Sequence, residues 1–563
     1  MKINWSLVIG HWSLKSATIF CFLFSTFLYA QAQLREIPYN SDSTFYRADL
    51  AIKNADRCYF LFLEADSLVS LPSNFTLLKN LKGITFKHCP MVNWEETFHQ
   101  LTQLPSLEYL EISINQIKSL PDDMGDLKNL QSLNLKSNAL TSLPNSITQL
   151  NKLQFLNLSF EHALDWSATF DLLARMSSLE SLDLSGAGFF SLPENFSSLS
   201  SLREIDLSDN HLTSLPQGIS KMLSLETFIL KNNPDLDFEK AMTSFAQLPS
   251  LKNLNLSSND LKTLPASIGN LKSLEKLDLS SNLLEELPKT FTQLIQLKEL
   301  NLGTDAVAVR SNRIHELPKD FGQLVNLEKL NLNRDSIGNI PAAVASMSQL
   351  KELDMTFCGL YEISEALHSC KNLEVLILDH NKINKIPDWI GELTNLKVLQ
   401  LDGDFFVNHL LKIQLLPSSI GNLKQLEILS LRDQVIPALP ASINQLQKLR
   451  VLDLRDNLIS KLPDDFSSLQ NLEYLDLKAN ELTSLPPDFS SLKKLKHVSI
   501  AYNSSLDLQG AAAILRQMPW LQTLDISFNQ LSPQIYYDLK KSLPKTKIIA
   551  KGFNNLVWDP DRR

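Results

Sequence analysis

The sequence predicts a solenoid, which is a stack of short repeats that pack against their neighbours. The first observation is a 23-residue phrase with apolar residues at positions 1, 4, 6, 11, 14, 18 and 21 and asparagine at position 9. It occupies Leu107–Asn129 (LEYLEISINQIKSLPDDMGDLKN) and recurs in Leu130–Lys152. A fixed period of this length is the signature of stacked repeats. A solenoid offers a long surface rather than one chemical pocket, so the period also limits the function.

The second observation is the order of residues within each unit. Positions 4 and 6 are apolar and position 5 is polar, as in Leu452, Asp453 and Leu454. This alternation predicts a short strand with one buried face. The asparagine at position 9 lies where the strand turns away, and its amide can satisfy buried backbone groups of adjacent turns. Proline after position 14 favours an extended segment at that point.

The pattern recurs in twenty units, counted by the residue at position 1. The units begin at Cys58, Leu81, Leu107, Leu130, Leu153, Leu179, Leu202, Leu225, Leu251, Leu274, Leu297, Leu327, Leu350, Leu373, Leu396, Leu426, Leu449, Leu472, Leu495 and Leu521. The phrase LxxLxLxxNxLxxLPxxIxxLxx resembles the leucine-rich repeat superfamily. The Leu264-Pro265 and Ile268-Gly269 pairs look most like its Ras-group and disease-resistance subclass. This resemblance implies an α/β solenoid with a curved parallel β-sheet on the concave face and extended turns and short helices on the convex face.

Two kinds of unit depart from the 23-residue length. Units of 26 residues lack Leu-Pro and carry Asn93, Asp165, Asp237 or Asp507 at position 13. Asparagine and aspartate are good helix N-caps, so we expect a true helix on the convex side of these units.

Units of 30 residues insert seven residues after the strand, within 303–318 and 402–417. Insertions at one point of the unit emerge on one rim, which is often the binding rim. The second insertion is too apolar for a solvent-exposed loop that makes no contacts, because it contains Phe405, Phe406, Leu410 and Leu411. These side chains either fold back onto the rim or touch a partner.

The first 32 residues read as a signal peptide. Residues 1–32 contain Lys2 and Lys15 but no acid, an apolar run at 17–30, and a small-x-small cleavage site ending at Ala32. The apolar run is too short for a typical transmembrane helix, although a single membrane anchor is the alternative. We therefore expect an extracytoplasmic chain (secreted, periplasmic or on the cell surface) with no membrane span after cleavage. Losing two lysines and no acid changes the net charge from -9 to -11.

The remaining chain divides into a repeat region and two caps. We assign residues 33–57 to an N-terminal cap, 58–544 to the twenty repeats and 545–563 to a C-terminal cap. Tyr46, Leu50 and Ile52 are candidates to cover the open end of the first unit. Caps are required because the stack would otherwise expose its core.

Motifs for catalysis are absent from the sequence. It contains no GxGxxG, P-loop, HExxH, CxxC or GxSxG motif, so we expect no enzyme and no cofactor. Asp379, His380, Asp402 and Asp404 fall on neighbouring units and could crowd around a cation. We favour a solvated polar face and no metal, because nothing fixes the ligand geometry.

Position 5 gives the concave surface an acidic stripe. Eight units carry an acid there and none carries Lys or Arg: Glu111, Asp183, Asp206, Asp278, Asp354, Asp453, Asp476 and Asp525. Such a stripe repels phosphates, so we expect no nucleic acid partner. A basic or mixed protein surface fits better, unless acids at this position are simply a habit of the repeat.

A candidate binding patch lies near the C-terminus. Tyr474 and His497 share position 3 of adjacent units, and Tyr502 and Phe528 share position 8. Strands lie about 4.8 Å apart, so each pair should be neighbours. Position 7 carries a column of basic residues beside them, namely Arg432, Arg455 and Lys478. Aromatic and arginine clusters are typical of interface hot spots, although packing under the cap is an alternative.

These observations favour a non-enzymatic, exported scaffold that recognises a protein through its concave face and its rim insertions. Besides the C-terminal patch, Phe405 and Phe406 are the candidate partner-binding residues. One alternative is a glycan-binding surface protein, because aromatic rows on a polar sheet would serve that function. Another is an intracellular scaffold for GTPases or signalling proteins, if the leader is not a signal peptide.

Overall fold

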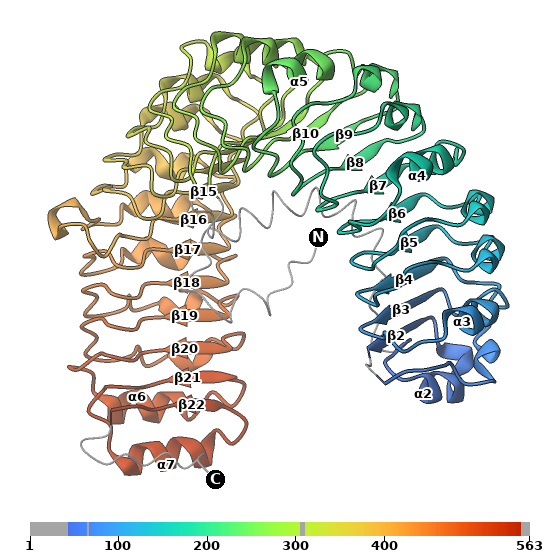
Figure 1. The fold of residues 1–563 in the computed structure, drawn as a ribbon. Coiled ribbons are helices and arrows are strands. Elements are labelled where there is room, and N and C mark those ends of the chain that lie inside the picture. The colour runs from blue at the N-terminus through green and yellow to red at the C-terminus, as the bar shows by residue number, and fades with distance from the viewer. Residues whose placement is uncertain (1–42, 65–66, 305–309, 553–563) are drawn as a thin grey trace.

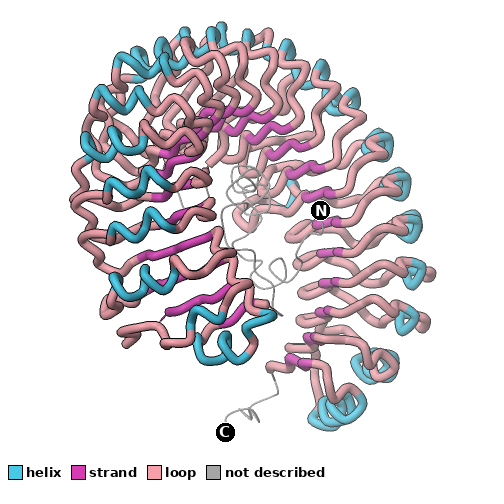
Figure 2. The backbone as a smooth tube through the Cα atoms, turned by 90° about the vertical axis from the view of Figure 1, so that its right-hand side faces the viewer, coloured by secondary structure: helices cyan, strands magenta, loops and turns pink. Residues whose placement is uncertain are grey.

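The computed structural model describes residues 43–64, 67–304 and 310–552. The predicted signal peptide lies outside these ranges, as does Trp558. The described chain is an α/β solenoid that bends into an arch (Figure 1). The strands line its inner, concave side and the helices lie on the outer side (Figure 2), as the sequence predicts.

One parallel sheet runs through the described chain. Each strand pairs with the next in the sequence, from β1 to β22. The strands are β1 (Thr44–Phe45), β2 (Phe60–Glu64), β3 (Gly83–Lys87), β4 (Tyr109–Ser113), β5 (Ser132–Asn134), β6 (Phe155–Asn157), β7 (Ser181–Asp183), β8 (Glu204–Asp206), β9 (Thr227–Ile229), β10 (Asn253–Asn255), β11 (Lys276–Asp278), β12 (Glu299–Asn301), β13 (Lys329–Asn331), β14 (Glu352–Asp354), β15 (Val375–Ile377), β16 (Val398–Gln400), β17 (Ile428–Ser430), β18 (Val451–Asp453), β19 (Tyr474–Asp476), β20 (His497–Ser499), β21 (Thr523–Asp525) and β22 (Lys547–Ile549). From β3 to β21 equal repeat positions face each other, so each position forms a continuous column.

The α-helices form on the convex side where the sequence places N-caps. They are α2 (Ala48–Lys53), α3 (Trp94–Leu101), α4 (Trp166–Leu173), α5 (Phe238–Phe245), α6 (Leu508–Leu515) and α7 (Pro533–Ser542). In α3 to α6 the side chain of the predicted N-cap accepts a backbone N–H from the first turn, as Asp237 does from Lys240. This confirms the helices predicted for the 26-residue units.

Short 3-10 helices replace the α-helix in the other units, mostly directly after the proline. They are η1 (Ala55–Arg57), η2 (Phe75–Leu77), η3 (Asp122–Asp126), η4 (Asn145–Gln149), η5 (Glu194–Ser198), η6 (Gln217–Lys221), η7 (Ala266–Asn270), η8 (Lys289–Gln293), η9 (Phe321–Gln323), η10 (Ala342–Ser346), η11 (Glu365–Ser369), η12 (Asp388–Glu392), η13 (His409–Leu411), η14 (Ser418–Asn422), η15 (Ala441–Gln445), η16 (Phe466–Ser468) and η17 (Phe489–Ser491). Each contributes one buried apolar residue at position 18, such as Phe291 or Ile420, except η1 and η13.

The N-terminal cap covers the first unit with Ile52, as expected, but not with Tyr46 and Leu50. Ala51 of α2 is fully buried and Ile52 packs against the core. Tyr46 and Leu50 stay exposed, and the Tyr46 ring instead stacks on Phe62 at a centroid distance of 5.8 Å. At the other end, α7 packs beside α6 and β22 adds the last strand.

Position 9 joins successive units through a ladder of side-chain amides. Asn282 is a representative member and is fully buried. Its Oδ1 accepts the backbone N–H groups of Asn259 and Leu261, at 2.9 and 3.1 Å. Its Nδ2 donates to the carbonyls of Leu256 and Leu279, at 2.9 and 2.8 Å. One side chain therefore satisfies four buried backbone groups in two units, as the sequence predicts for this position.

Glu161 is an acidic member of the same ladder. Its carboxylate is fully buried and accepts the backbone N–H groups of Asn138 and Leu140. A carboxylate accepts these bonds but cannot donate as an amide does. Burial raises the pKa of Glu161 to about 7, against the lowering effect of the two N–H bonds.

We expect Asn282→Ala to destabilise the stack on the order of 3–5 kcal/mol, because it leaves four buried backbone groups unsatisfied. Chemical denaturation followed by circular dichroism measures this change. Asn270→Ala is the matched control, since Asn270 is exposed on the convex side of the preceding unit. Equal unfolding free energies for both variants would contradict the role of the ladder.

Glu161 should make stability depend on pH. Its pKa is about 7 in the folded chain and 4.5 in its ordinary state, so the folded chain binds the proton more tightly. The stabilising contribution is therefore full below pH 4.5 and is lost as pH rises through about 7, a change of about 3 kcal/mol.

We expect Glu161→Asn to remove this dependence and to stabilise the chain at pH 8, since asparagine fills the same position in Asn233 and Asn503. Denaturation curves at pH 5 and pH 8 give the comparison. The difference in unfolding free energy between wild type and variant should change between pH 5 and pH 8. If it is the same at both pH values, Glu161 is not the titrating group.

Candidate recognition surface

The predicted basic column follows β17, β18 and β19 on the concave face. Arg432 Nε donates to Asp402 Oδ2 at 2.6 Å. Arg455 Nη2 donates to Asp453 Oδ2 at 2.7 Å, and its Nε lies 3.3 Å from Asp476 Oδ2. Two arginines and three acids thus alternate in one ion-pair network, so the acidic stripe and the basic column are not separate patches.

The acids of this region carry strongly perturbed pKa values. Burial raises the pKa of Asp476 to about 7, and the nearby Asp453 carboxylate adds to the effect. Burial and the neighbouring Asp402 raise the pKa of Asp379 well above its usual value. Within the described residues, Asp354 Oδ2 and Asp379 Oδ2 accept no hydrogen bond. The raised pKa of Asp379 favours its protonated, neutral form, so burial limits the negative charge at the β14–β16 end of the network.

The predicted aromatic pairs are neighbours. The Tyr502 and Phe528 rings stack at 4.2 Å with an interplanar angle of 22°, and Lys478 Nζ lies 5.3 Å above Tyr502. Both residues have a positive φ, near 56° and 58°, which places their side chains on the rim of the sheet. The other face of Phe528 lies against Gly552, where a Cβ atom would come within 2.5 Å of the ring. The protein therefore covers part of this stack, while Tyr502 and Phe528 remain 46% and 41% exposed.

The second aromatic pair is tied to the sheet by polar bonds. The Tyr474 and His497 rings lie 6.3 Å apart and are tilted by 42°. Tyr474 Oη donates to Asp476 Oδ2 at 3.2 Å, and His497 Nδ1 hydrogen-bonds with the Thr523 hydroxyl. The structure thus brings together all seven residues of the predicted C-terminal patch.

The apolar insertion lies apart from this patch. It projects from the stack beside β16, at the left of Figure 1. The Phe405 and Phe406 side chains are 83% and 92% exposed, and Leu410 is 73% exposed. The sequence left two alternatives for these side chains, which were to fold back onto the rim or to touch a partner. In the structure these three side chains do not fold back onto the rim. The other insertion behaves differently, because Arg310 forms an ion pair with Asp260.

A ladder of alternating charge at position 2 escaped the sequence reasoning. Fourteen consecutive units alternate between acid and base: Glu180, Arg203, Glu226, Lys252, Glu275, Lys298, Glu328, Lys351, Glu374, Lys397, Glu427, Arg450, Glu473 and Lys496. Most neighbours form ion pairs, such as Lys397 with Glu374 at 2.6 Å and Lys351 with Glu328 at 2.7 Å. A comparison of position 2 across all units predicts this ladder, because strand pairing places residues at the same repeat position next to each other.

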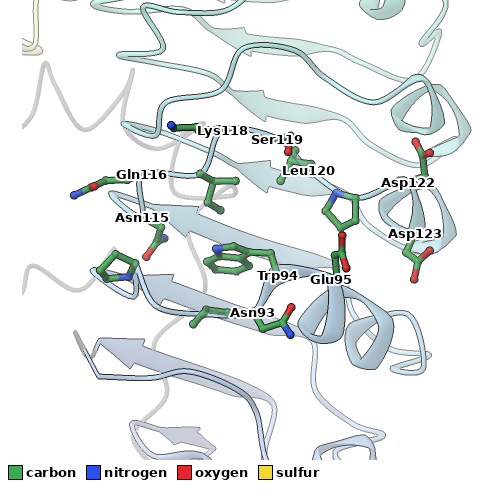
Figure 3. Close-up of a pocket in the computed structure, with 14 residues that line it drawn as sticks. Asn93, Trp94, Glu95, Asn115, Gln116, Lys118, Ser119, Leu120, Asp122 and Asp123 are labelled. Atoms are coloured by element: carbon green, nitrogen blue, oxygen red, sulfur yellow. The ribbon is translucent and has the colours of Figure 1, made fainter.

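A shallow groove lies between α3 and the following unit (Figure 3). Trp94 forms part of its floor, and Glu95, Asp122 and Asp123 line it with acids. Lys118 lines the same groove and adds one basic side chain to these acids.

No group of three or more His, Cys, Asp or Glu side chains in ranges 43–64, 67–304 and 310–552 could hold a metal ion. His380, considered above for a cation, stacks on Phe357 at 4.3 Å. None of the helices in these ranges is long and apolar enough to cross a bilayer.

Comparison with known proteins gives one consistent family. Models of leucine-rich repeats match residues 57–187 (a leucine-rich repeat region), 201–222, 249–306, 372–393, 424–505 and 517–535. A search of curated protein sequences finds no match.

Three solved structures align with most of this chain. A leucine-rich repeat protein of Leptospira interrogans is 27% identical, with 90% of this chain and 99% of that chain aligned and a TM-score of 0.43. The plant peptide hormone receptor RGFR1 in complex with RGF2 is 21% identical, with 90% and 87% aligned and a TM-score of 0.48. The TLR13–ssRNA13 complex is 22% identical, with 91% and 84% aligned and a TM-score of 0.51. The repeat phrase, the single parallel sheet and the family-model matches agree, and the chain belongs to the leucine-rich repeat superfamily.

Proposed function

We propose that the protein is an exported, non-enzymatic scaffold that binds a protein partner through its concave face and the insertion beside β16. The observation that carries the proposal is the exposure of Phe405 and Phe406 on a projecting segment. Exposing large apolar side chains to water is energetically unfavourable, and burying them in an interface is favourable. The Leu-Pro-x-x-Ile-Gly phrase supports placement in the Ras-group and disease-resistance subclass.

The aromatic geometry favours a protein over a glycan. Sugars stack on open ring faces, whereas Tyr502 and Phe528 stack on each other, with Lys478 over Tyr502 and Gly552 against Phe528, which leaves the two side chains 46% and 41% exposed. Tyr474 is tilted against His497 and bonded to Asp476. The surface offers ring edges and ion pairs instead, which suit protein side chains.

Export is supported by the leader alone. We expect the mature chain, isolated from its native host and read by mass spectrometry, to begin near Gln33 and to fractionate outside the cytoplasm. A chain that retains Met1 in the cytosol would contradict the proposal and favour an intracellular signalling scaffold.

The insertion can be tested without knowing the partner. A photocrosslinking phenylalanine analogue at position 406, introduced in the native host, should form a covalent adduct with one protein that mass spectrometry identifies. The same analogue at Phe190, which is 68% exposed and lies between β7 and β8, is the matched control. Phe405→Ser should reduce the adduct at position 406 severalfold, because it removes the neighbouring ring 5.7 Å away.

Identical adducts at positions 406 and 190 would argue against a specific site. The same holds if position 406 yields no adduct while the chain is folded and correctly located.

A further inference from the structure

The groove beside α3 lies where the backbone bonding between two units is interrupted. In regular contacts, position 12 of one unit donates its backbone N–H to the preceding unit, as Thr141 does to the Lys118 carbonyl at 3.0 Å, and position 10 does the same. Gln116 and Lys118 hold these two positions in the unit that follows α3. Within the described ranges, no backbone hydrogen bond joins residues 90–93 to residues 116–119. The groove is therefore an open junction between units.

The helix of the preceding unit accounts for this interruption. A 26-residue unit takes a different path after its strand from the 23-residue unit stacked on it, so the two outer segments do not run in register. Gln116 at position 10 has a positive φ of 57°, which turns the chain at the junction. Position 10 also has a positive φ after α4, α5 and α6, at Gly188, Asp260 and Gln530. The interruption is thus a regular consequence of a helical unit.

A ring from the following unit fills the same junction beside α4 but not beside α3. Phe189, at position 11 after α4, packs on Trp166 at a centroid distance of 4.8 Å. Position 11 after α3 is Ile117, and Trp94 instead packs edge-on against Phe86 of its own unit, at 5.4 Å. The groove left beside Trp94 has a volume of about 860 Å³. Ligand sites commonly have volumes of about 300–1,000 Å³.

The groove offers a backbone donor and an indole to the same ligand. The Lys118 N–H has no backbone acceptor in the ranges that the structure describes. Figure 3 shows the Trp94 ring in the middle of the groove, with Lys118 on one side and Asp122 on the other. An extended segment can accept such an N–H with a backbone carbonyl, as in strand addition, whereas the carbonyls of an α-helix are used within the helix. A lysine or arginine of the segment gains a cation–π contact with the indole.

The charge of the groove favours a cationic segment. Its lining includes three acids, Glu95, Asp122 and Asp123, and one base, Lys118. Asp123 lies 3.6 Å from His99. Glu95 and Asp122 are exposed, and neither forms an ion pair within the described part of the chain. Their carboxylates are therefore accessible to a basic side chain from outside.

We propose that this groove binds a short extended segment of a partner protein that carries a lysine or arginine. A backbone carbonyl of the segment accepts the Lys118 N–H, and its cationic side chain lies over Trp94 and faces Glu95 and Asp122. This site goes beyond the proposed function, because α3 lies on the opposite limb of the arch from β16 (Figure 1).

Fluorescently labelled peptides test the site on the full-length chain. The first peptide is Gly-Thr-Val-Arg-Val-Thr-Gly with both ends blocked, since its threonines and valines favour an extended chain. The second has glutamate in place of the arginine. Arginine amide with a blocked amino group, used as an unlabelled competitor, supplies the cation without the segment. Fluorescence anisotropy at low and high salt gives the dissociation constants.

We expect the first peptide to bind about tenfold or more tightly than the second, and to weaken with salt. The combined Glu95→Gln and Asp122→Asn variant should lose most of this preference, because it removes the two accessible carboxylates. Glu194→Gln is the matched control, since Glu194 is exposed at the same repeat position in the unit that follows α4. It should change the affinity by about twofold or less.

Two substitutions at Lys118 test the backbone donor. Lys118→Pro removes the N–H, whereas Lys118→Ala removes only the side-chain charge. The proline variant should bind the first peptide about fivefold more weakly than the alanine variant, because one hydrogen bond is lost. Thermal melting shows whether each variant is folded, and the variant without the two carboxylates decides the question if Lys118→Pro does not fold.

Equal affinities for the two peptides, no binding of either, or an unchanged affinity after loss of both carboxylates would overturn the assignment. Equal affinities of folded Lys118→Pro and Lys118→Ala would do so as well, because the backbone would then not hold the segment. Competition by the blocked arginine amide at the concentration of the peptide itself would reveal a site for a lone cation and would also overturn it. The adduct at position 406 does not depend on this groove, so the two proposals fail separately.

Discussion

The fold depends on the satisfaction of backbone groups between units rather than within them. A strand of three residues cannot stand alone, and each unit turns away from the sheet directly after it. The position 9 side chains meet this need, as Asn381 does by accepting from Cys358 and Leu360 and donating to the Met355 carbonyl. Because each unit supplies bonds to its neighbour, the sheet register is fixed along the whole stack, and a repeat position becomes a physical column.

Because each repeat position forms a column along the sheet, the residue types at each position determine the chemistry of the concave surface. The concave face consists of parallel stripes with different character: alternating charge at position 2, an apolar segment at position 3, and acids with arginines at positions 5 and 7. Arg432 and Arg455 are held by neighbouring carboxylates, so their main effect is to order the stripe. Removing one arginine would leave buried acids unpaired, which costs more than the net strength of the pair.

The sequence predicts most of the fold because its signals are local and repeated. Leucine spacing, the N-cap at Asp165 and the asparagine of the ladder each act within a unit or between adjacent units. The candidate site was predicted less completely. Residue types gave the aromatic pairs, but the bonding of Arg455 to Asp453 depends on rotamers that sequence does not encode. Whether Phe405 folds back or projects depends on loop conformation, and the charge ladder at position 2 appears only when one position is compared across many units.

The arrangement also argues for a rigid recognition surface. Ion pairs hold the charged stripes at positions 2 and 7, at 2.6 Å for Lys397 and Glu374 and 2.6 Å for Arg432 and Asp402. Side chains already ordered in this way lose little conformational freedom when a partner docks, so more of the contact energy appears as affinity. The segment at Phe405 and Phe406 is the contrasting element, since these two side chains are 83% and 92% exposed and are free to pack against a partner. A fixed concave trough with one adaptable rim segment would combine selectivity with tolerance of shape.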